Sequence, residues 1–410
     1  MTLPLEGVVV ADYSQYVAGP MCTLLLADLG ADVIKVEPPH GDQWRRQEPC
    51  GPDISKPFVA LNRNKRSVVI DLKSMDGRRN SRALIATADV VVHNCPPARA
   101  ERFGLDRASV LSANPQAVVV AISAFGSDGP DGGTAGYDLA AQAASGLLMA
   151  DSRVGDEVPV RAGGIAMTDF SAGMLAAVAA LAGLAGARES GIGCELETSL
   201  LGAALTLQIQ RLVSVSDDQG LAGQSGRQAT RDDLATVADQ AALEHRINPY
   251  YRAYATTDGF IAIACLNLAQ RRGLLAEFGL DDPAAENPDE PPSSAAETLR
   301  RERLTGTIAN ALARRATREW LARLAARRVP CQEVRTLTTM FASDQARANG
   351  LLQQINQPEL GAVELLGSPF KLDGKSLTAR RPAPSRGEHT DVVLETLSES
   401  RFAYCGRALP

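Results

Sequence analysis

One aspartate stands out as a residue that could do chemistry. Asp169 lies in the segment GGIAMTDFSAG, where an apolar run meets the start of a long, uncharged helical pattern. A carboxylate flanked by glycine and apolar residues is partly desolvated, and backbone N–H groups at a helix start could hold it ionised. Such a group can serve as a nucleophile or a base. The alternative is a helix N-cap, for which Asp169 and Thr168 are both suited.

Basic residues gather near the ends of predicted strands in the N-terminal region. They are Arg45, Arg46, Lys65, Arg66, Lys73, Arg99 and Arg102. Either they form an ordinary solvated surface, or some of them hold a phosphate-rich ligand at the carboxyl edge of a parallel sheet, where open α/β sheets bind ligands. Tyr137 and Asp138 follow a glycine-rich loop at 126–136, and either could be a simple turn residue.

The common nucleotide-binding and hydrolase motifs are absent from the sequence. Dinucleotide binding needs G-x-G-x-x-G directly after the first strand, but the sequence there is SQYVAGP, with one glycine. Neither a P-loop G-x-x-x-x-G-K-[ST] nor a G-x-S-x-G nucleophile elbow occurs. These absences argue against a dehydrogenase, a P-loop NTPase and an α/β-hydrolase.

The first 125 residues alternate between two kinds of segment. Helical patterns lie at 19–30, where Pro20 suits the first turn, and at 76–87. Near-continuous Val- and Ile-rich runs indicate strands at 7–14, 31–39, 67–73, 89–94 and 117–126. Apolar strands separated by helices predict a parallel sheet covered on both faces. We therefore expect a doubly wound α/β domain.

The middle of the chain changes character. Helices are predicted at 168–187 and 197–213, and the polar, aperiodic residues 214–247 are predicted to be a linker. The uncharged stretch 170–187 approaches the length of a membrane span. It consists mostly of Ala and Gly, whose hydrophobic drive for insertion is weak. A closely packed, buried helix is the better interpretation.

The region 248–345 is predicted to be a smaller α+β domain. It begins with a hairpin at 250–267 that turns at Asp258-Gly259. Helical patterns follow at 268–279 and 297–328, separated by an acidic, proline-rich loop. Strand-and-turn character returns at 358–372.

Composition excludes several classes of protein. The 410 residues carry a net charge of −6 and show no basic stripe, which argues against a nucleic-acid partner. The seven cysteines are scattered and never form C-x-x-C, and the four histidines form no H-x-x-x-H, so neither a disulfide framework nor a metal centre is expected. The N-terminus lacks a signal-peptide pattern. These features favour a cytoplasmic protein with reduced thiols.

Several segments together resemble the family III CoA-transferases, the CaiB/BaiF family, which also includes formyl-CoA transferase and α-methylacyl-CoA racemase. The resemblance begins with LEGVVVADYSQYVAGPMCTLLLADLGADVIKVEPPHGD at 5–42. It continues through GYDLAAQAASGLL at 136–148 and TDFSAGMLAAVAAL at 168–181. It resumes with NPYYRAYATTDGFIAIA at 248–264 and ends with GEHTDVVLETL at 387–397. It covers nearly the whole chain except a divergent stretch near 214–245.

The resemblance implies a chemical role for Asp169 and a set of CoA contacts. Asp169 falls on the family's catalytic carboxylate, which attacks an acyl-CoA thioester and passes through an aspartyl anhydride and an aspartyl-CoA thioester. Coenzyme A is then a substrate, and no tightly bound cofactor or metal is implied. The matching CoA or substrate contacts are Tyr16, Val17, Ala18, Ile70, Lys73, Asn94, Cys95, Arg102, Phe103 and Tyr137. Lys73 and Arg102 would hold phosphates, and Ile70 and Phe103 would contact the adenine.

The resemblance also implies an architecture of two interlocked protomers. A large Rossmann-like CoA-binding domain at 1–213 would be completed by about 373–410. The linker at 214–247 and a return segment at 346–372 would join it to the small domain at 248–345. The implied partners are an acyl-CoA donor, a small organic acid and a second copy of the chain, without membrane or nucleic acid.

Two departures from the family pattern bear on the reaction. Val17 stands where the formyl-CoA:oxalate branch has Gln, and Pro38 stands where that branch has Arg, which favours a larger or less polar acyl group. Tyr137 stands where the racemase branch has its His, and a tyrosine is a poor base at neutral pH. A CoA-transferase is therefore expected. A racemase and a non-catalytic acyl-CoA-binding protein are the alternatives.

Overall fold

The computed structural model divides the chain into two compact units. Unit 1 comprises Met1–Leu148, Arg161–Ser225 and Asp344–Pro410, and unit 2 comprises Met149–Val160 and Gly226–Ser343. The structure describes residues 2–152, 155–210, 212–213, 230–233, 235–236, 248–286 and 294–405, the last six without their side chains. Most of the predicted linker at 214–247 and part of the predicted acidic loop lie outside the described residues.

Unit 1 is built on a six-stranded sheet in which all neighbouring strands are parallel. The strands are β1 (Val9–Asp12), β2 (Asp32–Glu37), β5 (Arg66–Val69), β6 (Val90–His93), β7 (Val118–Ser123) and β8 (Cys194–Ser199). Their order in the sheet is β5-β2-β1-β6-β7-β8. This is the strand order of a doubly wound fold, so the predicted fold class is confirmed. The order reverses between β1 and β6.

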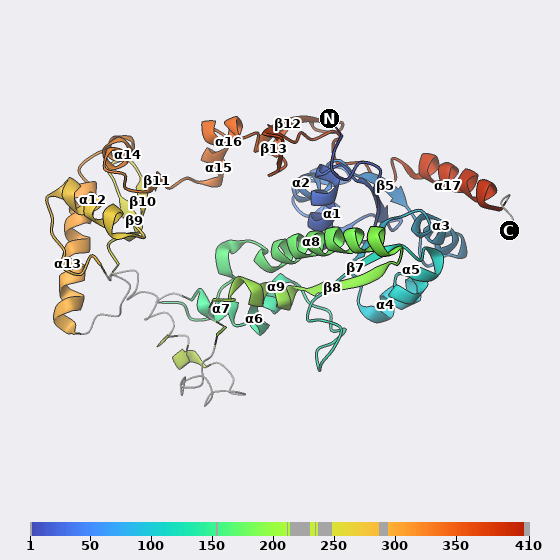
Figure 1. The fold of residues 1–410 in the computed structure, drawn as a ribbon, viewed down its shortest axis with the longest axis horizontal. Helices are drawn as coiled ribbons and strands as arrows, with labels where there is room; N and C mark the ends of the chain where they lie inside the picture. The colour runs from blue at the N-terminus through green and yellow to red at the C-terminus, as the bar shows by residue number, and fades with distance from the viewer. Residues whose placement is uncertain are drawn as a thin grey trace. The chain divides into compact units, whose positions relative to one another are not determined.

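Helices cover both faces of this sheet. On one face the core contains residues of α1 (Ala18–Asp28), α8 (Met167–Ser190) and α9 (Leu200–Leu207). On the other face it contains residues of α3 (Met75–Ile85), α5 (Arg107–Ala113) and α17 (Thr390–Cys405). Figure 1 shows α8 lying along β7 and β8. The Val runs of β6 and β7 are continuous rather than alternating because both faces of these strands are buried.

Helix α8 is the Ala-rich helix predicted at 168–187. Among the described residues it is the one helix long and apolar enough to cross a membrane. Its small residues also suit close packing, since Ala172, Ala176 and Ala180 are fully buried. A Cβ on Gly183 would lie 2.5 Å from the Val118 side chain, so only glycine lets the helix approach β7 this closely. Its composition is thus explained by its place in the core of unit 1.

The segment 197–213 differs from the single helix that was predicted. Its first three residues complete strand β8, and α9 begins at Leu200 and ends at Leu207. The Ser199 hydroxyl accepts a hydrogen bond from Gly202 N at 2.9 Å and caps this helix. Strand β8 lies at the edge of the sheet, and its glutamates point to solvent. It therefore lacks the continuous Val run that marks the central strands.

Unit 2 contains a three-stranded antiparallel sheet in the order β11-β10-β9. The strands are β9 (Tyr251–Ala255), β10 (Phe260–Ala264) and β11 (Cys331–Glu333), and β9 and β10 form the predicted hairpin. Three helices pack with the sheet, namely α12 (Leu268–Phe278), α13 (Ala295–Leu312) and α14 (Thr317–Ala326). The helical pattern predicted at 297–328 is broken between α13 and α14, where Trp320 Nε1 donates to Leu312 O at 2.8 Å.

The chain returns to unit 1 at Asp344, so the predicted return segment 346–372 lies within this unit. Strands β12 (Leu352–Gln357) and β13 (Gly361–Leu366) form a hairpin whose Leu365 packs with Phe58. The other elements are η1 (Gln43–Arg46), β3 (Pro49–Gly51), β4 (Ile54–Ser55), α2 (Lys56–Asn62), α4 (Pro97–Phe103), α6 (Asp138–Ala144), α7 (Leu147–Ala150), η2 (Ala162–Gly164), α15 (Leu337–Met340), α16 (Asp344–Ala348), β14 (Lys371–Leu372) and β15 (Lys375–Ser376).

Candidate active site

The carboxyl ends of β1 and β6 meet where the strand order of the sheet reverses. Gln15 follows β1 and Asn94 follows β6. Gln15 N donates to Asn94 Oδ1 at 3.1 Å, and Asn94 Nδ2 donates to Gln15 O at 2.7 Å. Open α/β sheets bind ligands in the crevice outside the strand ends at such a point. The predicted contacts Tyr16, Val17 and Asn94 therefore stand at the expected position for a ligand.

The turn that carries Tyr16 has an uncommon backbone conformation. Tyr16 has a φ of 68°, in the left-handed region that costs a non-glycine residue about 1–2 kcal/mol. Tyr16 N donates to Asp42 Oδ1 at 3.3 Å, and Trp44 N donates to the same oxygen at 2.9 Å. Asp42 is fully buried and forms a 2.8 Å ion pair with Lys35. A buried carboxylate thus holds the turn in this shape.

A second buried ion pair lies under the same turn. Lys65 Nζ is 3.3 Å from Asp12 Oδ2, and both side chains are fully buried. Asp12 Oδ1 also accepts from Ser14 N at 3.0 Å, and Lys35 Nζ donates to Ser14 O at 3.0 Å. Asp12, Lys35, Asp42 and Lys65 therefore form one buried charge cluster, which ties the β1–α1 turn to the neighbouring strands.

Two of the basic residues noted in the sequence are neither solvated nor available to a ligand. Lys65 belongs to the buried charge cluster. Arg45 is buried in a bidentate pair with Glu37, with both N–O distances at 2.7 Å, and its guanidinium lies 3.7 Å from the Phe58 ring centre. Lys73, Arg99 and Arg102 are exposed near the carboxyl ends of β5 and β6. These three cations remain accessible to a phosphate group.

Asp138, the first residue of α6, fixes the start of α8. Its Oδ1 accepts from Thr168 N at 2.9 Å and from Thr168 Oγ1 at 2.8 Å. Its Oδ2 accepts from Gln142 Nε2 at 2.9 Å, and Gln142 Oε1 accepts from Ala162 N at 2.9 Å. Asp138 thus accepts a hydrogen bond from one of the N–H groups that have no partner within the helix at its start. It is a structural anchor rather than a simple turn residue.

Asp169 follows Thr168 and does not act as a helix cap. Within the described part of the chain, its half-buried carboxylate forms neither a hydrogen bond nor an ion pair. Burial and the nearby negative charge of Asp138 raise the pKa of Asp169 to about 7, although Arg161 opposes this shift. One interpretation of the sequence was that backbone N–H groups at the helix start hold Asp169 ionised. Because this carboxylate accepts no hydrogen bond among the described residues, that interpretation is wrong. A carboxylate with a pKa near neutrality and free lone pairs is suited to nucleophilic attack.

Close packing of α1 against α8 brings the β1–α1 turn near Asp169. Gly173 lies one helical turn after Asp169, and a Cβ at this glycine would lie 2.5 Å from Ala18 O. Phe170 packs against the apolar cluster that contains Val17. The structure therefore places Val17, Ala18 and Asp169 in one neighbourhood. Val17 and Ala18 are only 4% and 3% exposed, so their side chains offer little surface to a ligand.

Three aromatic rings stand beside this neighbourhood. The Tyr16 ring makes edge contacts with Tyr137, at 5.6 Å between ring centres, and with Trp44, at 5.9 Å. Burial and the neighbouring Tyr137 raise the pKa of Tyr16 to about 12, so its hydroxyl is neutral at physiological pH. Tyr137 is 64% exposed, which leaves its ring open to a ligand.

The remaining predicted CoA contacts form a second group near α3 and α4. Ile70 is only 3% exposed, and Cys95 and Phe103 pack against the same core cluster. Lys73 and Arg102 are exposed, and the Arg102 guanidinium lies 5.9 Å from the centre of the Phe103 ring. This group offers two accessible cations and little apolar surface, because Ile70 is covered by its neighbours.

Sequence reasoning missed Asp42 and Arg161, and it did not find the role of Asp138. Asp42 holds Tyr16, Asp138 holds Thr168, and Arg161 Nε lies 3.9 Å from Asp138 Oδ2. Asp42 and Asp138 stand inside segments that carry the family resemblance, PPHGD and GYD, and this was the available signal. Arg161 lies in a segment without any recognisable motif.

Removing either of the two charged side chains beside Asp169 should shift the pH dependence of activity, and the two shifts should be in opposite directions. If the ionised carboxylate of Asp169 is the nucleophile, activity should rise with pH through about 7. Replacing Asp138 by Asn removes a negative charge, lowers the pKa of Asp169 and should move the acid limb of kcat/KM to lower pH. Replacing Arg161 by Gln removes a positive charge and should move it to higher pH. A pH series of kcat/KM for both variants tests this, and shifts in the same direction would contradict it.

Comparison with known proteins decides the family. A protein-family model described as CoA-transferase family III matches residues 5–390. The chain belongs to CoA-transferase family III. This CoA-transferase is 31% identical over 395 residues to the succinyl-CoA:glutarate CoA-transferase of Mus musculus, covering 96% of this chain and 86% of the relative. It is also 31% identical over 402 residues to the succinate–glutarate CoA-transferase of Agrobacterium fabrum, covering 96% of each chain.

A solved structure supports the same assignment. The crystal structure of a CaiB/BaiF family protein from Brucella suis superposes on this transferase with a TM-score of 0.74 and 28% sequence identity. The match covers 97% of this chain and 100% of the other. The relationship therefore extends through both compact units rather than through the parallel sheet alone.

Proposed function

We propose that this transferase moves CoA from an acyl-CoA thioester to a carboxylic acid through covalent intermediates on Asp169. The observation that carries the proposal is the state of this carboxylate, which is half-buried, free of hydrogen bonds among the described residues, and raised in pKa to about 7. It lies beside the ligand-binding crevice of a doubly wound sheet.

The proposed reaction exchanges one activated acyl group for another. An Asp169 oxygen attacks the thioester carbon and the C–S bond breaks, which releases the CoA thiolate and leaves a mixed anhydride between Asp169 and the donor acyl group. The thiolate attacks the Asp169 carbonyl carbon, which releases the donor acid and leaves an aspartyl-CoA thioester. The acceptor carboxylate attacks that thioester, its C–S bond breaks, and the CoA thiolate is released from a second anhydride. The thiolate then attacks the acceptor carbonyl carbon of this anhydride, and the C–O bond to the Asp169 carboxylate breaks. Asp169 is freed, and no ATP is consumed.

The surrounding residues have distinct parts in this proposal. Asp138 positions the start of α8 and maintains the raised pKa of Asp169. Tyr16 and Tyr137 form an aromatic wall at the crevice. The exposed cations Lys73 and Arg102 are the proposed phosphate contacts, because guanidinium and ammonium groups form charge-assisted hydrogen bonds with phosphate. Tyr16 is neutral at physiological pH, so it can donate a hydrogen bond but not act as a base.

The proposed substrates are dicarboxylic acids and their CoA thioesters. Two relatives at 31% identity are named for succinate or succinyl-CoA and glutarate. We therefore expect succinyl-CoA as donor and glutarate as acceptor to be the first productive pair.

Mass spectrometry of the intact protein and its peptides tests this proposal. The transferase is mixed with a panel of acyl-CoAs in heavy water, with and without glutarate. An acyl or CoA adduct on the Asp169 peptide, with no deuterium at the α-carbon, is the expected result. Deuterium at the α-carbon with an unmodified Asp169 would instead indicate a racemase. If the protein binds CoA but shows neither an adduct nor deuterium incorporation with any acyl-CoA of the panel, it is a non-catalytic binding protein and the proposed reaction is overturned.

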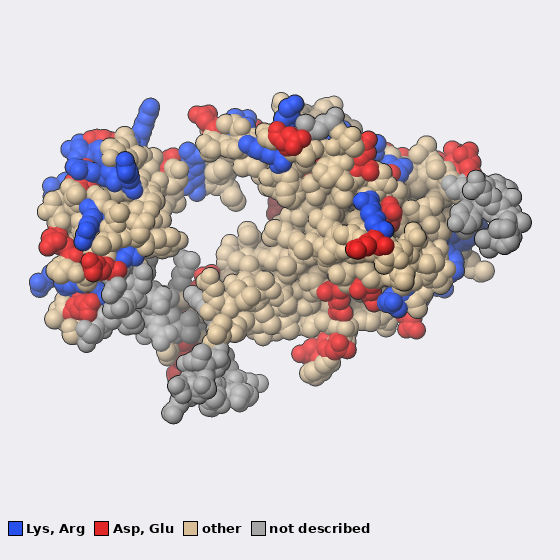
Figure 2. Space-filling model, viewed as in Figure 1, with Lys and Arg blue, Asp and Glu red and all other residues tan. Residues whose placement is uncertain are grey.

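The transferase is also proposed to act as an interlocked homodimer in the cytoplasm. Met174, Val178 and Leu181 are exposed on one face of α8 at helical spacing, and the surface over α8 in Figure 2 carries few charges. A second copy of the chain would cover this apolar face. Interlocked rings cannot separate without unfolding, so exchange of protomers should be blocked.

Subunit exchange between two differently tagged samples measures this interlocking. Light scattering should give twice the 43.3 kDa chain mass. Mixing the two native samples should give no hybrid, whereas co-expression or joint refolding should give hybrids. Rapid hybrid formation under native conditions would show a dimer that is not interlocked, and a mass of 43.3 kDa would rule out the dimer.

A further inference from the structure

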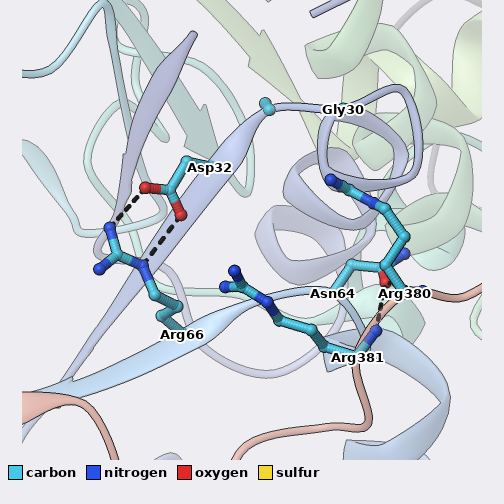
Figure 3. A pocket seen from close by; sticks show the side chains of 7 residues that line it. Gly30, Asp32, Asn64, Arg66, Arg380 and Arg381 are labelled. Carbon is cyan, nitrogen blue, oxygen red and sulfur yellow. Dashed lines mark hydrogen bonds and ion pairs between the residues drawn. The ribbon is translucent and has the colours of Figure 1, made fainter. Parts of the chain in front are cut away.

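A small cavity lies at the amino ends of β2 and β5, on the opposite edge of the sheet from Tyr16 and Asn94. Its volume is about 250 Å³. The lining residues are Gly30, Ala31, Asp32, Asn64, Arg66, Arg380 and Arg381. Figure 3 shows the guanidinium groups of the three arginines gathered around it. This amino-edge pocket takes no part in the proposed acyl transfer.

The charges around the amino-edge pocket do not balance. Arg66 is committed to Asp32, with Nε donating to Oδ1 at 2.9 Å and Nη2 forming a second bond to the same carboxylate. Arg380 and Arg381 have no carboxylate partner within the described part of the chain. Arg380 Nη2 donates to Ala27 O at 2.5 Å, which leaves its other donors open. The lining therefore carries an excess of two positive charges.

The arginine pair is held in place by a buried amide. Asn64 is 5% exposed, and its Oδ1 accepts from Arg380 N at 2.6 Å and from Arg381 N at 3.0 Å. Asn64 N donates to Arg381 O at 3.1 Å, and Asn64 Nδ2 donates to Asp28 Oδ1 at 2.8 Å. The backbone of Arg380 and Arg381 is thus fixed to Asn64, close to the start of β5, which lowers the ordering cost of binding a ligand.

We propose that Arg380 and Arg381, beside the paired Arg66, form a binding site for a compact dianion, a dicarboxylate or a phosphate. Guanidinium forks bind carboxylate and phosphate oxygens in the same bidentate geometry, so the charge and the donors suit both. The cavity is smaller than the roughly 300–1,000 Å³ of sites for drug-sized ligands, so it suits a compact ligand better than a whole nucleotide. The ligand neutralises the two unpaired charges and is bound independently of CoA.

Titration of the full-length transferase with inorganic phosphate, succinate and acetate tests the proposal. Isothermal calorimetry at low ionic strength gives the affinities, and proton NMR of the His389 ring gives a local signal. His389 Nδ1 accepts from Ser67 N at 3.4 Å next to β5, and burial lowers its pKa, with Arg66 and Arg381 contributing in the same direction. A bound dianion should therefore raise the pKa of His389. Acetate, with one charge, should bind more weakly than either dianion.

Two variants and one competition experiment decide the outcome. Arg381→Gln should weaken dianion binding at least about tenfold and abolish the His389 response. Arg188→Gln removes a cation exposed at the end of α8 and should change neither. If only one of phosphate and succinate binds, the site is supported and that compound identifies the class of its ligand. Absence of binding, an equal loss in both variants, or displacement of the dianion by CoA would overturn the proposal.

Discussion

The Asp169→Asn variant should lose turnover by at least about 10³-fold while it still binds CoA. The amide has the shape of the carboxylate but lacks the anionic oxygen that attacks the thioester, so the covalent route is closed. In the structure this side chain makes no hydrogen bond among the described residues, and its replacement leaves no partner unpaired. The folded state should therefore be little affected. Steady-state kinetics with succinyl-CoA and glutarate, together with calorimetric titration of CoA, measures the two effects separately.

A matched variant separates the nucleophile from a general effect of charge. Asp76→Asn changes an exposed carboxylate in the first turn of α3 and should retain full turnover. If Asp169→Asn kept more than a few per cent of the wild-type kcat, attack by this carboxylate would be excluded. If it lost CoA affinity as well as turnover, Asp169 would be acting in binding rather than in acyl exchange.

The second large effect concerns stability. Lys65→Met should lower the free energy of unfolding by about 3–5 kcal/mol, because it leaves the Asp12 carboxylate buried without its cation. The ammonium group also donates to Pro20 O and Asn62 Oδ1, both at 3.0 Å, so two further acceptors lose a donor. Urea denaturation followed by circular dichroism measures the loss. Activity should fall too, since the cluster supports the turn that carries Tyr16.

A double-mutant cycle shows whether the uncompensated charge is the cause. The pair Asp12→Asn with Lys65→Met removes both charges and should recover part of the lost stability. Lys56→Met, at an exposed position, is the control for loss of a lysine and should change stability by less than about 0.5 kcal/mol. Additive losses in the double variant would show that the two buried side chains act independently.

The parallel sheet could be predicted because each of its central strands is marked by the composition of its own few residues. The strands β1, β2, β5, β6 and β7 are runs of Val and Ile, and such runs are buried wherever they occur in a doubly wound fold. Strand β8 escaped prediction because it is an edge strand with outward-facing glutamates. Its alternating pattern beside a helical segment did not reveal which sheet it would join.

Only part of the candidate site could be predicted, because it depends both on a local sequence motif and on contacts between elements that are distant in the sequence. The position of Asp169 came from a motif, and family resemblance supplied its proposed role. Its pKa near 7 depends first on burial and then on the charge of Asp138, which lies in another helix, and both arise only through tertiary packing. The same holds for Lys65 and Arg45, whose burial depends on carboxylates in other elements. A list of basic residues cannot distinguish these buried pairs from exposed phosphate ligands.

Unit 1 is discontinuous in sequence, and this sets an order of events during synthesis. Its last segment begins at Asp344 and supplies Pro384 O, which accepts from buried Arg45, as well as Thr390 Oγ1, which accepts from Val69 N. Helix α17 of the same segment covers one face of the sheet. A nascent chain that has emerged only as far as unit 2 therefore has α3 and α5 on that face but still lacks the part of the cover that α17 provides. The core of unit 1 is therefore completed only after the segment that contains α17 has been synthesised.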